Sequence, residues 1–518
     1  MRRLGPVLQF LGCQGDCWGV SALIVGDDGD AAPVFEFARA DLSATCTQAP
    51  VPGMAATAWR FDFAVPLTAS AQSIDYFVDG QAFAFTLPAQ AAMPDMAYVS
   101  CNGYSDARAR KHQQAPNALW ARMARLHGGQ EQVGDTRYGP LHLLLHGGDQ
   151  IYSDDMWAAL PELRAWTERD WFQRCQAPLT DSLRAELQAL FARWYVERWS
   201  QPEVAWMLAR VPSVMMWDDH DILDGWGSHL AQLHDSPVFQ GIFAIARAAF
   251  ELFQRQMMGA LPPATLPGQS AHHSAYRIGP AGLLVLDMRS ERRPGPDGGR
   301  PGMDLRSGQV IGAESWRAIY AWLDANAGSG MRHLFVMASI PVMHPSFETL
   351  RRLLGVFLGQ QELEDDLRDH WTSPAHRAER LRLIHRLLGA SAAGTRVTVL
   401  SGDVHVAATG IIEATMASAS GRAGLIEQLT SSGVEHPPPA GVSLPFLEQA
   451  GLEVEAIDPG ITGRMAAFPG TQRRVIGRRN FMTLQADAPG RGERYWVNWW
   501  AEGEAHPYTK VIAPIASS

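Results

Sequence analysis

The sequence predicts an α/β protein with a small β-sandwich at its N-terminal end. Three observations support this fold class. Short segments within about the first ninety residues partly alternate between apolar and polar positions and are broken by Gly, Pro and Asp clusters, which is typical of strands joined by turns. From about Met96 onwards, short apolar runs alternate with helical stretches, which indicates a sheet with helices packed outside it. The final stretch of the chain returns to strands.

The N-terminal β-sandwich domain is predicted to span residues 1–93. Its strands are expected at Val7–Leu11, Val20–Val25, Trp59–Val65 and Ala82–Leu87. The segment from Ala89 to Pro94 has the composition of a linker. A second domain is predicted over residues 94–518, with helical insertions and C-terminal strands.

The second domain is expected to hold six core strands. They are Met96–Ser100, Leu141–Leu145, Ser213–Trp217, Gly282–Leu286, His333–Ser339 and Arg396–Leu400. Helices are predicted at Asp181–Trp199, Gln240–Met258, Glu314–Ala325 and Ala378–Leu388. In the last of these helices the large apolar residues share one face, as expected for a helix packed on a sheet. Closing strands are predicted at Asn480–Leu484 and Tyr495–Trp500.

Composition narrows the class of protein. The 518 residues are 46% hydrophobic, and 44 Lys+Arg against 54 Asp+Glu give a net charge of −10. This excludes a disordered chain and argues against nucleic acid as the main partner, because phosphate backbones need a basic face. Five cysteines without a C-x-x-C pair favour a reducing compartment. We therefore expect a cytoplasmic protein in preference to export through the Arg2-Arg3 pair, and no apolar run is long enough for a transmembrane helix.

Five predicted strands are followed by titratable or metal-binding side chains. Ligands of open α/β sheets bind beyond the carboxyl ends of the strands, so these side chains are expected to meet. The segments are Ser100-Cys101-Asn102, Gly148-Asp149-Gln150-Ile151-Tyr152, Asp218-Asp219-His220-Asp221, Asp287-Met288-Arg289 and Ser401-Gly402-Asp403-Val404-His405. Scattered surface charge would not sort in this way, so the pattern predicts an active site.

The residue types at these strand ends indicate a metal centre. Carboxylates, a thiolate, an imidazole and a phenolate suit a hard, highly charged metal such as iron, with a second oxygen-loving ion beside it. Two metals stabilise the attacking and leaving oxygens of an in-line displacement. Arg289 is expected to hold the planar oxygens of a phosphate. The G-x-S-x-G and H-E-x-x-H signatures of other hydrolases are absent from the sequence.

In order and strand-end placement, these motifs resemble those of the alkaline phosphatase D (PhoD-like) family of calcineurin-like metallophosphoesterases. The resemblance runs from about residue 96 to 410, and Asp369-His370-Trp371 resembles a further family segment. It implies a four-layer α/β/β/α core and a metal-dependent hydrolase of a small phosphoester, in which a metal-activated hydroxide attacks phosphorus. It also implies two metal ions, iron and calcium or another divalent ion. The family's small N-terminal β domain agrees with the pattern of the first ninety or so residues.

The resemblance assigns roles by position. The metal ligands it implies are Cys101, Asp149, Tyr152, Asp403 and His405, with Asp149 as the bridging carboxylate. His220 matches a histidine that contacts phosphate and protonates the leaving oxygen. Two alignments disagree about the residue that closes the second metal site. Asp219 matches the superfamily's Asn in G-N-H-D, whereas Asp224 stands where PhoD-like sequences usually carry Asn, and both stay candidates.

Two other functions remain as alternatives. One is a phosphodiesterase that acts on a phospholipid or a nucleotide. The other is a metal-binding interaction protein that keeps the fold without turnover. The intact Cys-Asp-Tyr-Asp-His set favours catalysis over the second alternative. The preference for monoesters or diesters and the oligomeric state are left open by the sequence.

Overall fold

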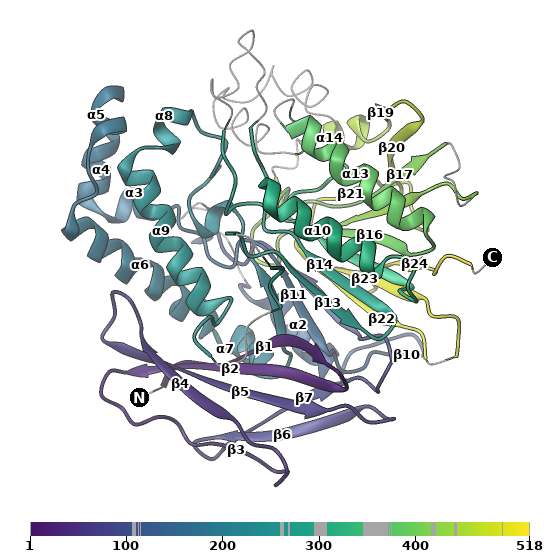
Figure 1. The fold of residues 1–518 in the computed structure, drawn as a ribbon, viewed down its shortest axis with the longest axis horizontal. Helices are drawn as coiled ribbons and strands as arrows, with labels where there is room; N and C mark the ends of the chain where they lie inside the picture. The colour runs from purple at the N-terminus through teal and green to yellow at the C-terminus, as the bar shows by residue number, and fades with distance from the viewer. Residues whose placement is uncertain are drawn as a thin grey trace.

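Two large β-sheets face each other across the apolar centre of the molecule (Figure 1). One buried cluster joins them: Leu8, Tyr98 and Leu145 come from one sheet, Val285 and Leu400 from the other. The computed structural model describes residues 2–105, 110–111, 113, 115–259, 264–267, 270–294, 308–344, 371, 373, 376–415, 421–439, 443–488 and 490–516. The predicted α/β class is confirmed.

The first sheet has ten strands. In spatial order they are β24 (Tyr508–Ile512), β23 (Tyr495–Ala501), β22 (Asn480–Ala486), β8 (Met96–Val99), β11 (Leu143–Gly147), β12 (Ser213–Met216), β1 (Arg2–Gln14), β2 (Cys17–Asp27), β5 (Ala56–Pro66) and β4 (Thr45–Pro50). Strands β8, β11 and β12 run parallel, so their carboxyl ends meet at one edge. They are short and fully buried, as is usual for parallel strands covered on both faces.

The second sheet has nine strands. They are β13 (Ser274–Ile278), β14 (Ala281–Val285), β15 (His333–Met337), β16 (Arg396–Ser401), β18 (Leu425–Thr430), β17 (Ala407–Ala414), β20 (Ile461–Ala466) and β19 (Val454–Asp458), with β21 (Val475–Ile476) beside β17. Strands β14, β15, β16 and β18 are parallel. Strands β17 to β20 were not predicted from the sequence.

Four of the N-terminal strands do not form a sheet of their own. Strand β1 pairs in parallel with β12, with Gln9 opposite Ser213, so β1, β2, β5 and β4 extend the ten-stranded sheet. The physical reason is that β1 is apolar on both faces: Leu4 and Val7 join one buried cluster, Leu8 and Phe10 the other. Strands from both sides of residue 93 therefore share one sheet. The division of the chain into domains there stays a prediction.

A small three-stranded sheet packs beside β5. Its strands are β3 (Phe35–Phe37), β6 (Gln72–Val78) and β7 (Gln81–Leu87). The contact is made by aromatic rings: Phe35 stacks on Phe61 with centroids 4.8 Å apart, and Phe63 lies 6.0 Å from Phe85. The three-stranded sheet and β5 thus form two packed layers within the region where the sequence predicts a β-sandwich.

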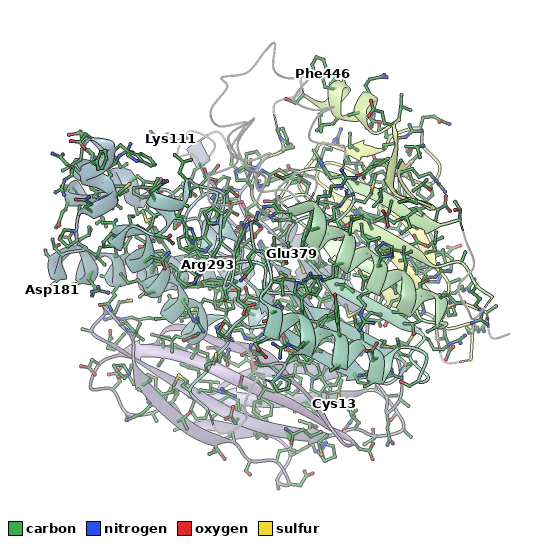
Figure 2. The ribbon with its side chains drawn as sticks, turned by 45° about the horizontal axis from the view of Figure 1, so that its top comes forward. Cys13, Lys111, Asp181, Arg293, Glu379 and Phe446 are labelled. Carbon is green, nitrogen blue, oxygen red and sulfur yellow. The ribbon has the colours of Figure 1, made fainter. Side chains whose placement is uncertain are left out.

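Helices pack against each large sheet on the face turned away from the other. The first sheet's cluster includes residues of α2 (Ala118–His127), α6 (Asp181–Trp199), α7 (Pro202–Leu208) and α9 (Pro237–Phe253), and the second sheet's cluster includes residues of α10 (Ala313–Asn326) and α13 (Arg377–Ala392). Glu379 (labelled in Figure 2) ties α13 to α10, because its buried carboxylate accepts from the indole of Trp316 at 3.1 Å and from Val310 N at 2.8 Å.

The remaining elements are short. They are β9 (Gln132–Val133), β10 (Thr136–Arg137), α3 (Met156–Ala159), α4 (Pro161–Thr167), α5 (Trp171–Gln176), the 3₁₀ turn η1 (Asp219–Asp221), α8 (Ala231–His234) and α14 (Leu444–Ala450). Among the helices of the described residues, none is both long and apolar enough to cross a bilayer. Asp369 and His370, part of the segment that resembles a family motif, lie outside the described residues, and Trp371 is buried.

Candidate metal centre

Backbone hydrogen bonds clip the strand-end loops of the two sheets together. After β8 and β11, Cys101 N donates to Gly148 O at 3.2 Å, and Asn102 N donates to Asp149 O at 2.7 Å. The loop after β18 crosses to the other sheet, where Val434 N donates to Ser100 O at 2.9 Å. The loops after β8, β11 and β18 are therefore held together where the carboxyl ends of both parallel strand sets meet.

Two groups of side chains lie close enough together to hold a metal ion. In the first group, ligand atoms of Asp149, Asp219 and His220 are all within 4.8 Å of one another. In the second, the same holds for Asp218, Asp219 and Asp403. Asp219 belongs to both groups. A carboxylate that belongs to two neighbouring groups can serve two ions that lie close together, as the ions of two-metal sites do.

The surroundings of the Asp149 carboxylate indicate whether these residues suit a cation. Its side chain is 1% exposed, and its Oδ1 has no hydrogen-bond partner among the described residues. Burial raises the pKa of Asp149 well above its usual range, and the carboxylates of Asp218 and Asp219 add to the rise against the opposing effect of His220. A buried carboxylate oxygen without a donor is costly unless a cation reaches it. The donor set therefore fits a metal ion.

Backbone strain also concentrates at this centre. Nine described non-glycine residues have positive φ, and four of them are Cys101 (54°), Asp149 (54°), Asp403 (65°) and His405 (52°). Each such conformation costs about 1–3 kcal/mol and persists where the surroundings impose it, commonly at functional sites. The strain falls on four residues that the sequence assigned to metal binding.

Cys101, Tyr152 and His405 lie beside the two groups. Tyr152 Oη is 3.3 Å from His405 Nε2. Burial raises the pKa of the Cys101 thiol well above its usual range, with further increases from Asp149 and Asp403, and the pKa of Tyr152 rises through burial and then through Cys101 and Asp149. The Tyr152 ring also lies 4.4 Å from the ring of His220, a member of the first group.

His220 is oriented by a residue that the sequence analysis missed. Its Nδ1 lies 2.8 Å from Asp154 Oδ2, which leaves Nε2 as the free ring nitrogen of the pair. Burial disfavours the charged ring, but Asp154, Asp219 and Asp149 together raise the pKa of His220 well above its usual range. Asp154 follows Asp149 by five residues in the same loop, and this proximity was the available signal.

Arg289 is fully buried and contacts acidic residues of the centre. Its guanidinium donates to Asp218, to Asp219 Oδ1 at 3.2 Å and to the carbonyl of Trp226 at 3.0 Å. Ser339 Oγ also donates to Asp218, at 2.8 Å. Arg289 therefore holds the two aspartates in place. Its contact with a phosphate stays a prediction.

The two candidates for closing the second metal site are placed differently. Asp219 is buried, and its Oδ2 accepts from Gly225 N at 2.8 Å while it joins both groups. Asp224 is exposed and belongs to neither group; its backbone carbonyl accepts from His229 at 2.9 Å. The geometry favours Asp219, and the ligand role of each stays a prediction.

His436 is a further residue at the centre that was not predicted. Its ring stacks on His405 with centroids 3.7 Å apart. It follows β18, whose sequence Leu-Ile-Glu-Gln-Leu-Thr was not recognised as a strand. The rule that led to the other strand ends would have selected His436 if β18 had been predicted.

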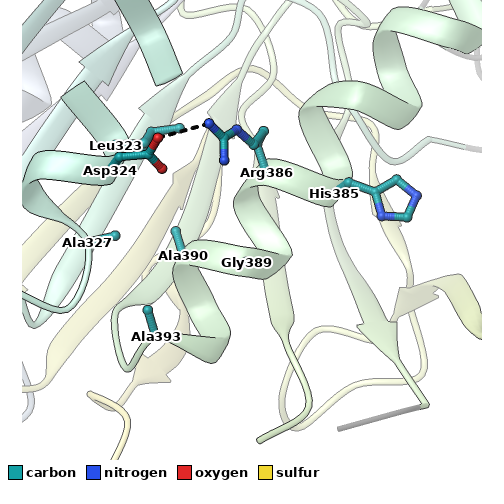
Figure 3. Close-up of a pocket in the computed structure, with 8 residues that line it drawn as sticks. All are labelled: Leu323, Asp324, Ala327, His385, Arg386, Gly389, Ala390 and Ala393. Carbon is teal, nitrogen blue, oxygen red and sulfur yellow. Dashed lines mark hydrogen bonds and ion pairs between the residues drawn. The ribbon is translucent and has the colours of Figure 1, made fainter. Parts of the chain in front are cut away.

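A groove between α10 and α13 is a separate feature of the surface (Figure 3). It encloses about 330 Å³, and Asp324 and Arg386 form an ion pair of 3.1 Å at its wall. Its lining is Leu323, Asp324, Ala327, His385, Arg386, Gly389, Ala390 and Ala393. None of the predicted ligands lines this groove, so the strand-end centre remains the candidate site.

Sequence comparison relates the chain to phosphatases. The sequence model of the PhoD related phosphatase family matches residues 130–358 and 351–453. The uncharacterized protein YGR266W of Saccharomyces cerevisiae is 26% identical over 416 residues, which make up 68% of this chain and 56% of the yeast protein. The chain thus spans little more than half the length of that curated relative.

Two solved structures share the fold. The structure of PhoD superposes with a TM-score of 0.55 at 14% identity, covering 98% of this chain and 88% of PhoD. Purple acid phosphatase PPD1 from yellow lupin (Lupinus luteus) seeds superposes with a TM-score of 0.51 at 11% identity, covering 98% of this chain and 74% of the lupin chain. At these identities the likeness concerns the fold alone.

Proposed function

Because the chain belongs to the PhoD related phosphatase family, we propose that it is a metal-dependent phosphoester hydrolase. The four-layer α/β/β/α core with an N-terminal β-sandwich, implied by the resemblance, is part of this proposal. So is a small phosphoester as substrate. A diester of a phospholipid or a nucleotide is the more specific form of the same hypothesis.

One observation carries the proposal: Asp219 is shared by two groups of potential ligands, and the buried Asp149 beside it has an oxygen without a donor. Two neighbouring cations would satisfy both features. The protein itself supplies one positive charge here, because the Arg289 guanidinium donates to Asp218 and Asp219. Asp149 keeps an oxygen that accepts no hydrogen bond among the described residues, and this oxygen is proposed to bind metal.

The proposed ligands are Cys101, Asp149, Tyr152, Asp219, Asp403 and His405, and the proposed ions are iron and calcium or another divalent ion. When bound, such ions supply Lewis-acid stabilisation of charge on phosphoryl oxygens and activate water. The protein's role is to hold the ligands. Arg289 donates to both Asp218 and Asp219, and Ser339 donates to Asp218. The backbone contacts of Cys101 and Asn102 hold the loop that carries Asp149.

His220 is the proposed proton donor to the leaving alcohol. Asp154 holds Nδ1, so Nε2 is the nitrogen proposed to donate the proton. Burial lowers the pKa of His220, and among the groups that raise it the Asp154 carboxylate has the largest effect. A protonated ring is the state needed by a general acid. Asp154 is proposed to set the ring's orientation.

The test combines metal analysis with two substrates. Purified protein is analysed for metal by inductively coupled plasma mass spectrometry and assayed with p-nitrophenyl phosphate and bis-p-nitrophenyl phosphate. We expect about two ions per chain and hydrolysis of at least one of the two substrates. This activity should be lost when a chelator removes the metal and should return when metal is added back. Bound metal without hydrolysis of either compound would favour the non-catalytic alternative, and a protein that takes up no metal would refute the proposal.

A further inference from the structure

Four aromatic rings follow one another beside the candidate centre. The Tyr152 ring lies 4.4 Å from the His220 ring on one side and 5.3 Å from the His436 ring on the other, at 20° to the latter. The His436 ring is in turn stacked on His405 at 3.7 Å and 14°. Three of these rings are predicted site residues. The fourth, His436, is the one that touches both Tyr152 and His405.

Both ring nitrogens of His436 are occupied by its own surroundings. Nδ1 donates to the carbonyl of Pro437 at 2.8 Å, and Nε2 lies 2.9 Å from Ser105 Oγ. With Nδ1 acting as donor, Nε2 accepts the hydroxyl hydrogen of Ser105. The contact of His436 with Tyr152 and His405 is therefore made by the face of the ring, which carries no proton and offers no lone pair.

A buried anchor holds the loop that carries His436. His436 N and Glu435 N both donate to Cys101 O, at 3.2 and 3.3 Å. Glu435 is completely buried, and its carboxylate accepts from three donors: Tyr104 Oη at 2.7 Å, Asn117 N at 2.5 Å and Arg479 Nη1 at 3.3 Å. Breaking the contacts of a buried carboxylate is strongly unfavourable, so the backbone at His436 is held firmly against the Cys101 loop.

We propose that His436 is a positioning residue whose ring face fixes the side chains of Tyr152 and His405 for metal binding. The inference rests on the proposed function, because it concerns two of the proposed ligands. The physical argument is that Tyr152 and His405 project from different loops and meet through a contact of 3.3 Å between Tyr152 Oη and His405 Nε2. A flat ring packed against both removes the rotations that would otherwise separate them. Partners that orient metal ligands through hydrogen bonds typically contribute 10–100-fold to metal affinity, and we use this range as the scale for the packing contact of His436.

The test separates the ring face from the ring nitrogens. His436→Ala and His436→Leu remove the planar face, whereas His436→Phe keeps it and loses both nitrogens. His385→Ala is the matched control, since His385 is an exposed histidine of α13 paired with Asp458. Each protein is stripped of metal with a chelator and titrated with Co²⁺, and the visible absorption spectrum reports both the affinity and the ligand geometry.

The expected result is a loss of about 10–100-fold in Co²⁺ affinity with an altered spectrum for His436→Ala and His436→Leu. His436→Phe and His385→Ala should resemble the wild type. Thermal unfolding in chelator identifies any variant that fails to fold, and the Leu variant replaces the Ala variant in that case.

Three results would overturn the inference. If His436→Phe loses as much affinity as His436→Ala, the nitrogens and not the face are responsible. If the Ala and Leu variants bind Co²⁺ like the wild type, the positioning role is refuted while the proposed function stands. A wild-type protein that binds no Co²⁺ would refute the proposed function and the positioning role together.

Discussion

The aromatic interface beside β5 and the strand-end centre are both buried, but they are held together by opposite means. At the interface, Phe35 stacks on Phe61 and on Tyr76, at 4.8 and 5.3 Å, and apolar burial favours folding. At the centre, the carboxylates of Asp149 and Asp219 are buried within 4.8 Å of each other. Without a cation their charges disfavour folding.

This difference suggests a division of labour. The N-terminal strands stabilise the fold, whereas the strand ends hold buried charges and strained backbone that destabilise it. A substitution at the aromatic interface should therefore lower stability and leave activity unchanged. A substitution at the strand-end centre should lower activity and raise the stability of the metal-free protein. That expectation can be broken by experiment.

The largest effect is expected for Asp149→Asn. The amide removes a charge that the site needs for metal, so turnover should fall by orders of magnitude and bound metal should decrease. The same change removes an unfavourable buried charge, so the metal-free protein should unfold at a higher temperature than the metal-free wild type. Asp41→Asn, at an exposed surface position, is the control for both measurements. Normal metal content and near-normal turnover in Asp149→Asn would refute its role.

Substitutions of His220 and Asp154 should affect catalysis more than metal binding. His220→Asn removes the proposed general acid, and loss of such a group typically lowers the rate about 10²–10⁴-fold. Bound metal, measured by mass spectrometry, should stay near the wild-type amount. Asp154→Asn leaves the imidazole in place and alters only the partner of Nδ1, so its loss of turnover should be smaller. Loss of metal in His220→Asn would make His220 a ligand instead.

The sequence was informative wherever chemistry directly follows a continuous apolar run. Strands β8, β12 and β16 were predicted within one or two residues of their ends. Cys101 and Asp219 follow strands of the first sheet, and Asp403 follows a strand of the second. Strand β11 was predicted two residues too early, because the buried His146 was assigned to the loop that follows it. The error did not matter for Asp149, since the loop begins directly after Gly147.

Features that depend on partners far along the chain could not be predicted. The pairing of β1 with β12 joins Gln9 to Ser213, and the sequence contains no local signal for such a pairing. Strand β18 mixes Glu427 and Gln428 with apolar residues, so His436 behind it was overlooked. Arg289 was expected to face substrate, but only the structure shows that its donors contact Asp218 and Asp219.

A substitution at the aromatic interface beside β5 should lower stability without changing turnover, the opposite of the result expected for Asp149→Asn. Phe63 is 3% exposed and contacts both Phe37 and Phe85. Phe63→Ala removes a buried ring and leaves a cavity, which typically costs about 3–5 kcal/mol of unfolding free energy. Turnover per folded molecule should be unchanged, as measured below the unfolding transition with the folded fraction determined by circular dichroism. A fall in turnover beyond the folded fraction would couple the two regions and end the proposed division of labour.

The smallest effect is expected at Asp224, and it marks the edge of the centre. Asp219 is buried and shared by both ligand groups, whereas Asp224 is exposed and lies outside them. Asp219→Asn should therefore abolish hydrolysis of monoester and diester alike, and Asp224→Asn should leave the ratio of the two rates unchanged. The ratio is the sensitive readout, because a carboxylate that faces the substrate repels a phosphate dianion more than a diester monoanion. If Asp224→Asn raises the monoester rate relative to the diester rate, Asp224 acts on the substrate, and the centre extends to the position that PhoD-like sequences usually fill with Asn.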